Sequence, residues 1–325
     1  MRMSNASSRC FPATLRQRKH VAGRRQRLAT TALAILASLA SAASACAEHA
    51  ASMLTTAAYP EGPLWHEGRL YYVEYTAHNV MTWDGTAAHV YWHRDRCGPS
   101  GLIEFHGGLL VACYDENALV LLDAGGRESA VIRAPRHADS MRGPNDLADD
   151  GRGGVYVSAS GVYEKKAPIN GTIWHLAADG RRLTQVADTI HYPNGLTRSA
   201  DGRYLLVAEM LAGRILSFEI RADGSLGART VWARLQDLAP PTPNEDAYNG
   251  PDGLKLGPDG NYYVAQNGSG RVLVVNAEGA LVRMIAVPTP YVTNLAFGTD
   301  GVVFVTGAFD QWNAPFTGAV YRWAP

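Results

Sequence analysis

The sequence predicts an all-β protein, a six-bladed β-propeller whose blades are four-stranded and antiparallel. Three observations predict it: a proline-centred motif that recurs along the chain, a hydrophobic strand after each copy, and Asp-Gly or Glu-Gly turns between the later strands. The composition fits a globular domain, since 46% of the residues are hydrophobic and 18% are charged. We expect one propeller domain over residues 50–325, after a signal peptide at residues 1–47.

The recurring motif is a short turn that leads into a strand. Its copies cover residues 59–63, 98–102, 143–147, 192–196 and 250–254, with a degenerate copy at 292–295. Successive copies lie 39 to 58 residues apart, and repeats of this length are typical of propeller blades. No amphipathic helical pattern interrupts them.

Three further strands are expected in each blade. The second strands are expected at 70–75, 109–114, 155–160, 204–210, 262–267 and 302–307, and the third strands at 79–84, 118–123, 172–177, 214–219, 271–276 and 319–324. The fourth strands are expected at 89–93, 128–133, 183–188, 229–234 and 281–287. The last blade lacks a fourth strand because the chain ends at Pro325. Residues 52–58 are expected to supply it and close the ring.

The first 47 residues have the order of a secretory signal. They carry eight Lys or Arg and no acid, followed by an Ala-rich apolar segment at 28–45 that ends in small residues. Arg24 and Arg25 resemble the paired arginines of a twin-arginine signal, and the Sec route stays open. Lipidation of Cys46 is the alternative to simple cleavage. The mature protein is therefore expected to be periplasmic or secreted, without a membrane span.

The charge of the remaining chain indicates which partners to expect. It holds 22 Lys or Arg against 30 Asp or Glu, a net charge of −8. Such a body repels phosphate backbones and anionic lipid, so nucleic acid and membrane surfaces are not expected partners. The sequence does not indicate the oligomeric state.

Two cysteines remain after the signal segment, Cys97 and Cys113. In an oxidising compartment they can form a disulfide, and two buried thiols are the alternative.

Equivalent positions of the six motif copies are expected to form a ring at the mouth of the channel. We call these positions the oxygen ring; they are Glu61, Ser100, Asn145, Asn194, Asp252 and Thr293. Their carboxylates and amides suit one hard divalent cation, with Ca²⁺ favoured and Zn²⁺, Mn²⁺ or Mg²⁺ as alternatives. Such residues also follow proline as ordinary turn formers, which explains one position more readily than six in register.

The chain resembles the SMP-30/gluconolactonase/regucalcin family over nearly the whole mature part. The resemblance is carried by Pro60-Glu61-Gly62-Pro63, Pro144-Asn145-Asp146, Pro193-Asn194-Gly195, Pro251-Asp252-Gly253 and Thr293-Asn294. It implies Glu61, Asn194 and Asp252 as metal ligands and Asn145 as a substrate-orienting residue. In sugar lactonases an arginine often stands two residues before that asparagine. Arg142 stands three before Asn145 and is the substrate-binding candidate in a shifted register.

The resulting hypothesis is a metal-dependent hydrolase that opens a small, sugar-type lactone. The cation would polarise the carbonyl group, and Asp252 would be the catalytic base that activates water. No serine elbow, P-loop or dinucleotide fingerprint competes. Two alternatives stay open: organophosphate or arylester hydrolysis at the same site, and a binding propeller in which the metal is only a structural plug.

Overall fold

The computed structural model of the chain describes residues 50–135, 141–240 and 249–325. The predicted signal peptide at 1–47, with Cys46, lies outside these residues, so export and lipidation stay predictions. Within the described residues, no helix is long and apolar enough to cross a bilayer. The described part is mostly strand, with a short helix α2 (Leu235–Leu238) and the 3-10 turns η1 (Met210–Ala212) and η2 (Thr299–Gly301).

Four sheets each contain four antiparallel strands that pair in chain order. Their strands are β2 (Pro60–His66), β3 (Arg69–Glu74), β4 (Asn79–Trp83) and β5 (Ala88–His93); β6 (Pro99–Phe105), β7 (Gly108–Cys113), β8 (Ala118–Leu122) and β9 (Glu128–Ile132); β10 (Pro144–Asp149), β11 (Val155–Ala159), β12 (Gly171–Leu176) and β13 (Leu183–Ile190); and β14 (Pro193–Arg198), β15 (Tyr204–Glu209), β16 (Arg214–Ile220) and β17 (Leu226–Arg234).

A fifth sheet holds eight strands in two halves. The halves are β18 (Gly250–Leu256), β19 (Tyr262–Asn267), β20 (Arg271–Val275) and β21 (Leu281–Ala286), and then β22 (Tyr291–Phe297), β23 (Val303–Ala308) and β24 (Thr317–Trp323) with β1 (Ser52–Ala58). A single residue pair, Asn267 with Tyr291, joins the two halves. The prediction of an all-β fold is confirmed, and its four-stranded antiparallel sheets are consistent with a propeller.

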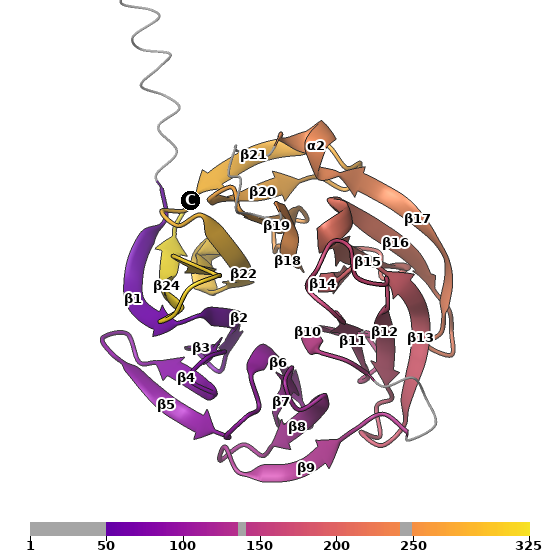
Figure 1. Cartoon of the computed structure of the whole chain (residues 1–325), viewed down its shortest axis with the longest axis horizontal. Coiled ribbons are helices and arrows are strands. Elements are labelled where there is room, and N and C mark those ends of the chain that lie inside the picture. Colours follow the sequence, from indigo (N-terminus) through magenta and orange to yellow (C-terminus); the bar gives the residue numbers. More distant parts are fainter. Residues whose placement is uncertain (1–49, 136–140, 241–248) are drawn as a thin grey trace, which may run out of the picture. The chain divides into compact units, whose positions relative to one another are not determined.

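The first strands of these groups lie around a common centre (Figure 1). Strands β2, β6, β10, β14, β18 and β22 contact one another in that order, and β22 contacts β2 in turn. Strand β1 pairs with β24, from Ser52 opposite Arg322 to Ala58 opposite Thr317. The prediction that residues 52–58 complete the last group is therefore confirmed.

Apolar clusters pack each group of strands onto the next. In one cluster, Val73 and Val80 from the first sheet meet Leu109 and Val111 from the second. The cluster that joins the first sheet to the last strands closes the circle, with Leu70, Tyr72 and Met81 packed against Phe304 and Val320. Burial of each such side chain contributes about 1.5–3 kcal/mol to the stability of the fold. The clusters therefore stabilise every junction between neighbouring groups of strands.

Each first strand is irregular at the same point of the repeat. In β2 the pairing with β3 shifts between Glu61 and Leu64, and corresponding shifts occur in β6, β10, β14, β18 and β22. A bulge of this kind bends the strand and redirects its side chains. Consecutive residues can therefore both face the centre, which regular alternation would prevent.

The glycine of the motif lets neighbouring first strands approach closely. A Cβ atom on Gly195 would lie 2.4 Å from the Asp252 carbonyl oxygen and 2.2 Å from the Leu254 nitrogen. Any side chain there would collide with β18 backbone. The glycine after Asn194 thus brings that asparagine close to the strand that carries Asp252.

Cys97 and Cys113 form a disulfide, which confirms the first of the two sequence readings. The bond joins the segment before β6 to the end of β7. It therefore fixes the start of the strand that carries Ser100.

Candidate active site

Five members of the oxygen ring line one cavity of about 270 Å³. Four of them are the predicted metal- and substrate-binding residues of the ring, Glu61, Asn145, Asn194 and Asp252, and the fifth is Ser100. The side chains of these four residues are all buried, and Asp252 is only 2% exposed. The structure therefore brings together at one point residues that lie up to 191 positions apart in the sequence.

The two hydroxyl members of the ring tie neighbouring strands together. The Ser100 hydroxyl donates to the Pro144 carbonyl oxygen at 2.9 Å. The Thr293 hydroxyl donates to the Pro60 carbonyl oxygen at 2.8 Å. Both hydroxyls are thus used between first strands, which leaves the carboxylates and amides to face the cavity.

The amide of Asn145 is oriented by a short chain of hydrogen bonds. Its Nδ2 donates to the Ser160 hydroxyl at 3.1 Å, and that hydroxyl donates to the Pro193 carbonyl oxygen at 2.6 Å. Because a carbonyl oxygen only accepts, this chain fixes the direction of every donor in it. The Asn145 Oδ1 is left buried without a hydrogen-bond partner. In this orientation Asn145 offers an acceptor, which suits a cation, a water or a substrate hydroxyl.

Three further oxygens of residues that line the cavity are also buried without a hydrogen-bond partner. Asn267 Nδ2 donates to Asp252 Oδ2 at 3.0 Å, and the Oδ1 atoms of both residues are buried without a partner. Asn194 Nδ2 lies 3.6 Å from the Met210 sulfur, and its Oδ1 is likewise unpartnered. Buried acceptors normally find a donor, so four orphaned oxygens in one cavity require an explanation.

The two carboxyl groups of the cavity disfavour each other's charge. Burial raises the pKa of Glu61 well above its usual range, and repulsion from Asp252 raises it further. Burial also raises the pKa of Asp252, against the hydrogen bond from Asn267, which lowers it. A divalent cation between the two carboxylates would remove this cost. Across the described chain, no three His, Cys, Asp or Glu side chains gather as metal ligands, so amide oxygens must complete any donor set.

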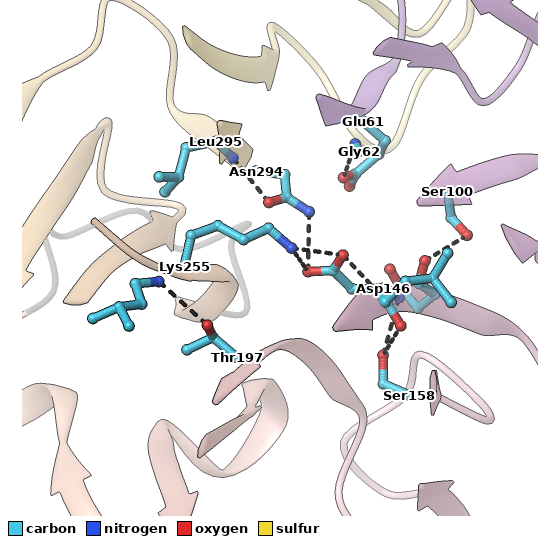
Figure 2. A network of polar contacts seen from close by, with 12 residues as sticks. Glu61, Gly62, Ser100, Asp146, Ser158, Thr197, Lys255, Asn294 and Leu295 are labelled. Carbon is cyan, nitrogen blue, oxygen red and sulfur yellow. Dashed lines mark hydrogen bonds and ion pairs between the residues drawn. The ribbon is translucent and has the colours of Figure 1, made fainter. Parts of the chain in front are cut away.

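A second polar group lies on the same first strands. Asp146, which is 1% exposed, accepts two hydrogen bonds from the Lys255 ammonium at 2.9 and 2.7 Å, and one from Asn294 Nδ2 at 3.4 Å (Figure 2). We call these three residues the Asp146 cluster. Its strands are β10, β18 and β22, so it joins the halves of the large sheet to the third group. Here the buried carboxylate has a cationic partner.

Arg142 is the remaining predicted site residue. Its side chain is exposed, and it is not among the residues that line the cavity. Its predicted contact with substrate stays a prediction.

Sequence reasoning missed Asn267 and the tyrosines of the cavity wall. Asn267 ends β19, and the residues just after the other second strands include Tyr75 and Tyr114, which also line the cavity. Tyr59 and Tyr192 occupy the first position of the motif and line it too. The second-strand ends repeat with the blade as the first-strand starts do, and this alignment is the sequence signal that marks Asn267.

Comparison with known proteins gives consistent matches. Residues 59–309 match the model of the SMP-30/gluconolactonase/LRE-like region. The lactonase drp35 of Staphylococcus aureus is 30% identical over 145 residues, and this match spans only 42% of that relative's length and 44% of this chain.

Solved structures with the same fold include a regucalcin from Agrobacterium tumefaciens, described as a calcium-binding protein. It has a TM-score of 0.68 and 20% identity, over 84% of this chain and 92% of that one. A gluconolactonase from Xanthomonas campestris has a TM-score of 0.66 and 21% identity, over 85% of this chain and 95% of that one. At these identities the two structures show the fold alone.

Proposed function

The chain belongs to the SMP-30/gluconolactonase/LRE-like family, and from this premise we propose that it is a metal-dependent lactonase. It would hydrolyse the ester bond of a small lactone to give a hydroxy acid. The observation that carries the proposal is the set of four buried side-chain oxygens without partners in one cavity that also holds two carboxyl groups.

Glu61, Asn194 and Asp252 would hold one divalent cation through their side-chain oxygens. Two carboxylates and an amide form a hard donor set, so Ca²⁺ is favoured over Zn²⁺, Mn²⁺ or Mg²⁺. The unpartnered oxygens of Asn194 and Asp252 fit this role, because a cation satisfies both. When bound, the cation supplies a Lewis acid that stabilises negative charge on the substrate's carbonyl oxygen.

Asp252 would be the general base. One of its oxygens accepts from Asn267, which fixes the carboxylate, and the other faces the cavity without a partner. The Asp252 carboxylate, which would also contact the cation through this oxygen, would take a proton from a neighbouring water as that water's oxygen bonds to the carbonyl carbon. The ring ester bond then breaks, and the departing oxygen takes up a proton to become the product's hydroxyl. Asn145 would orient the substrate or its water through Oδ1, and Arg142 would contact the substrate from outside the cavity.

The test is metal removal with a panel of substrates. Treatment with EDTA should reduce lactone hydrolysis to the rate in buffer, and Ca²⁺ should restore it. Full lactone hydrolysis by protein shown to be metal-free would contradict the proposal. A fluorophosphate and an aryl ester belong in the panel, because a faster rate on either assigns the same site to that chemistry instead.

The blade number and the location are part of the same proposal. Counting the halves of the eight-stranded sheet separately gives six blades around the centre. Export is supported by the Cys97–Cys113 disulfide, since disulfides persist in oxidising compartments. N-terminal sequencing of the protein from a periplasmic fraction tests export; a start at Met1 would contradict removal of residues 1–47.

A further inference from the structure

The wall of the active-site cavity is unusually aromatic. Six of its lining residues carry aromatic rings: Tyr59, Tyr75, Tyr114, Tyr163, Tyr192 and Phe316. The five tyrosines form a connected arc, which we call the tyrosine arc. Tyr75 packs edge-on against Tyr59 at 5.9 Å and against Tyr114 at 6.0 Å, and Tyr163 packs against Tyr192 at 4.8 Å, all between ring centroids.

Three of the phenol hydroxyls of this arc form hydrogen bonds within the protein. The Tyr75 hydroxyl donates to Asp115 Oδ1 at 2.8 Å. The Tyr114 hydroxyl donates to the Gly161 carbonyl oxygen at 3.0 Å, which leaves Tyr192 to donate to the Tyr114 oxygen at 3.1 Å. These three side chains therefore present ring carbon to the cavity rather than hydrogen-bonding groups.

The other lining groups add little charge to the wall. Among the described residues, no charged side chain besides Glu61 and Asp252 lines the cavity, and the Ser100 hydroxyl is already bonded to backbone. Outside the oxygen ring and Asn267, the polar groups of the wall are Thr76, Gln311 and the hydroxyls of Tyr59 and Tyr163. Each buried hydroxyl of a polyhydroxylated lactone needs its own partner, and a missing partner costs binding. A flat apolar ring needs none and can pack on the tyrosine rings.

We infer that the substrate is a small neutral lactone that carries an aromatic or flat apolar ring. This inference rests on the proposed lactonase activity of the same cavity. The ester group lies at the oxygen ring, and the apolar ring lies against the tyrosine arc. The cavity, at about 270 Å³, is slightly smaller than a typical site for drug-sized ligands and fits one or two fused rings. The substrate class thus differs from the sugar-type lactone expected from sequence.

Lactams give a test that is independent of turnover, because they share the lactone's shape and resist hydrolysis. Three six-membered lactams differ only in what surrounds the ring: dihydroquinolin-2-one with a fused benzene ring, unsubstituted δ-valerolactam, and polyhydroxylated gluconolactam. Calorimetry on the Ca²⁺-supplied protein should show the benzo-fused lactam binding at least tenfold more tightly than δ-valerolactam. Gluconolactam should bind no more tightly than δ-valerolactam. Tighter binding of gluconolactam, or equal binding of all three, would overturn the inference.

Variants of Tyr75 separate the ring from its hydroxyl. Tyr75→Phe keeps the ring and should preserve the preference for the benzo-fused lactam within about twofold. Tyr75→Ser removes the ring and should reduce the affinity for the benzo-fused lactam by about 3- to 10-fold, while the affinity for δ-valerolactam stays unchanged. Tyr204→Ser, on β15 outside the cavity, is the matched control and should change neither affinity. An equal loss for both lactams in Tyr75→Ser would contradict recognition by the ring.

Failure of this inference is distinct from failure of the proposed function. If the protein hydrolyses gluconolactone faster than dihydrocoumarin, each relative to its rate in buffer, the lactonase proposal stands and the aromatic preference is wrong. If no lactone is hydrolysed but the benzo-fused lactam still binds preferentially, the cavity's ligand class is supported and the catalytic proposal is wrong.

Discussion

The oxygen ring and the Asp146 cluster lie on the same first strands, yet they differ in whether their buried carboxyl groups have a cationic partner. In β10 the two regions are represented by consecutive residues, Asn145 and Asp146. The ring gathers Glu61 and Asp252 in a cavity to which the described part of the chain contributes no cationic side chain, and it leaves acceptor oxygens unpartnered. The cluster pairs its one carboxylate with the ammonium of Lys255.

This difference separates a site built for a ligand from one built for stability. A buried charge that is paired and hydrogen-bonded holds strands together, whereas buried like charges without partners lower stability until something binds them. The bulge in each first strand makes both possible, because it lets consecutive side chains face the centre. Substitutions in the ring should therefore change function, and substitutions in the cluster should change stability.

The largest expected effect is on turnover in the ring. Asp252→Asn keeps an oxygen for the cation but cannot accept a proton from water, so kcat should fall by about 10²- to 10⁴-fold. Ca²⁺ affinity, measured by calorimetry on the same variant, should fall far less. Wild-type turnover in Asp252→Asn would remove Asp252 as the general base from the mechanism.

The next effect is on stability in the cluster. Lys255→Met leaves the buried Asp146 carboxylate without its cation and should lower the free energy of unfolding by about 3 kcal/mol. This is the lower end of the range for buried pairs, because the Lys255 side chain is 22% exposed. Urea denaturation measures it. The double variant Lys255→Met/Asp146→Leu is the control and should lose less than the single one; an equal or greater loss would show that packing, not charge, is responsible.

The smallest expected effect is a gain in stability, from a substitution in the ring. In the presence of EDTA, Glu61→Gln should raise the free energy of unfolding at pH 7 by on the order of 1 kcal/mol, because it removes one of two repelling buried charges. The pKa of Glu61 is raised in the folded protein, so the wild-type chain binds its proton more tightly when folded. Its stability in EDTA should therefore fall as pH rises above the ordinary carboxyl range. Thermal unfolding from pH 5 to 8 measures this slope, and a slope unchanged by Glu61→Gln would contradict it.

The sequence predicted the ring better than the cluster, for a physical reason. The proline and glycine around each ring residue repeat with the blade, so Glu61, Asn194 and Asp252 could be placed in one register before any contact was known. Lys255 and Asp146 are 109 residues apart and meet only because the circle of strands closes. No local pattern marks such a pair.

The direction of the side chains in the first strands could not be predicted from the sequence. The repeat predicts the strands and the closing partner at residues 52–58, but not the bulge at which pairing shifts in every first strand. Asn267 went unnoticed because the motif ends before the second strand does. Its link to the site is its hydrogen bond to Asp252, which no sequence pattern marks.

We propose that the oxygen ring binds a cation that the Asp146 cluster does not need. A crystal structure of the mature protein grown with Ca²⁺ would decide this. We expect one ion bonded to the side-chain oxygens of Glu61, Asn194 and Asp252 at about 2.3–2.6 Å, with Lys255 still paired to Asp146. A ring that holds no ion at saturating Ca²⁺, or an ion bound at Asp146 in place of Lys255, would contradict it.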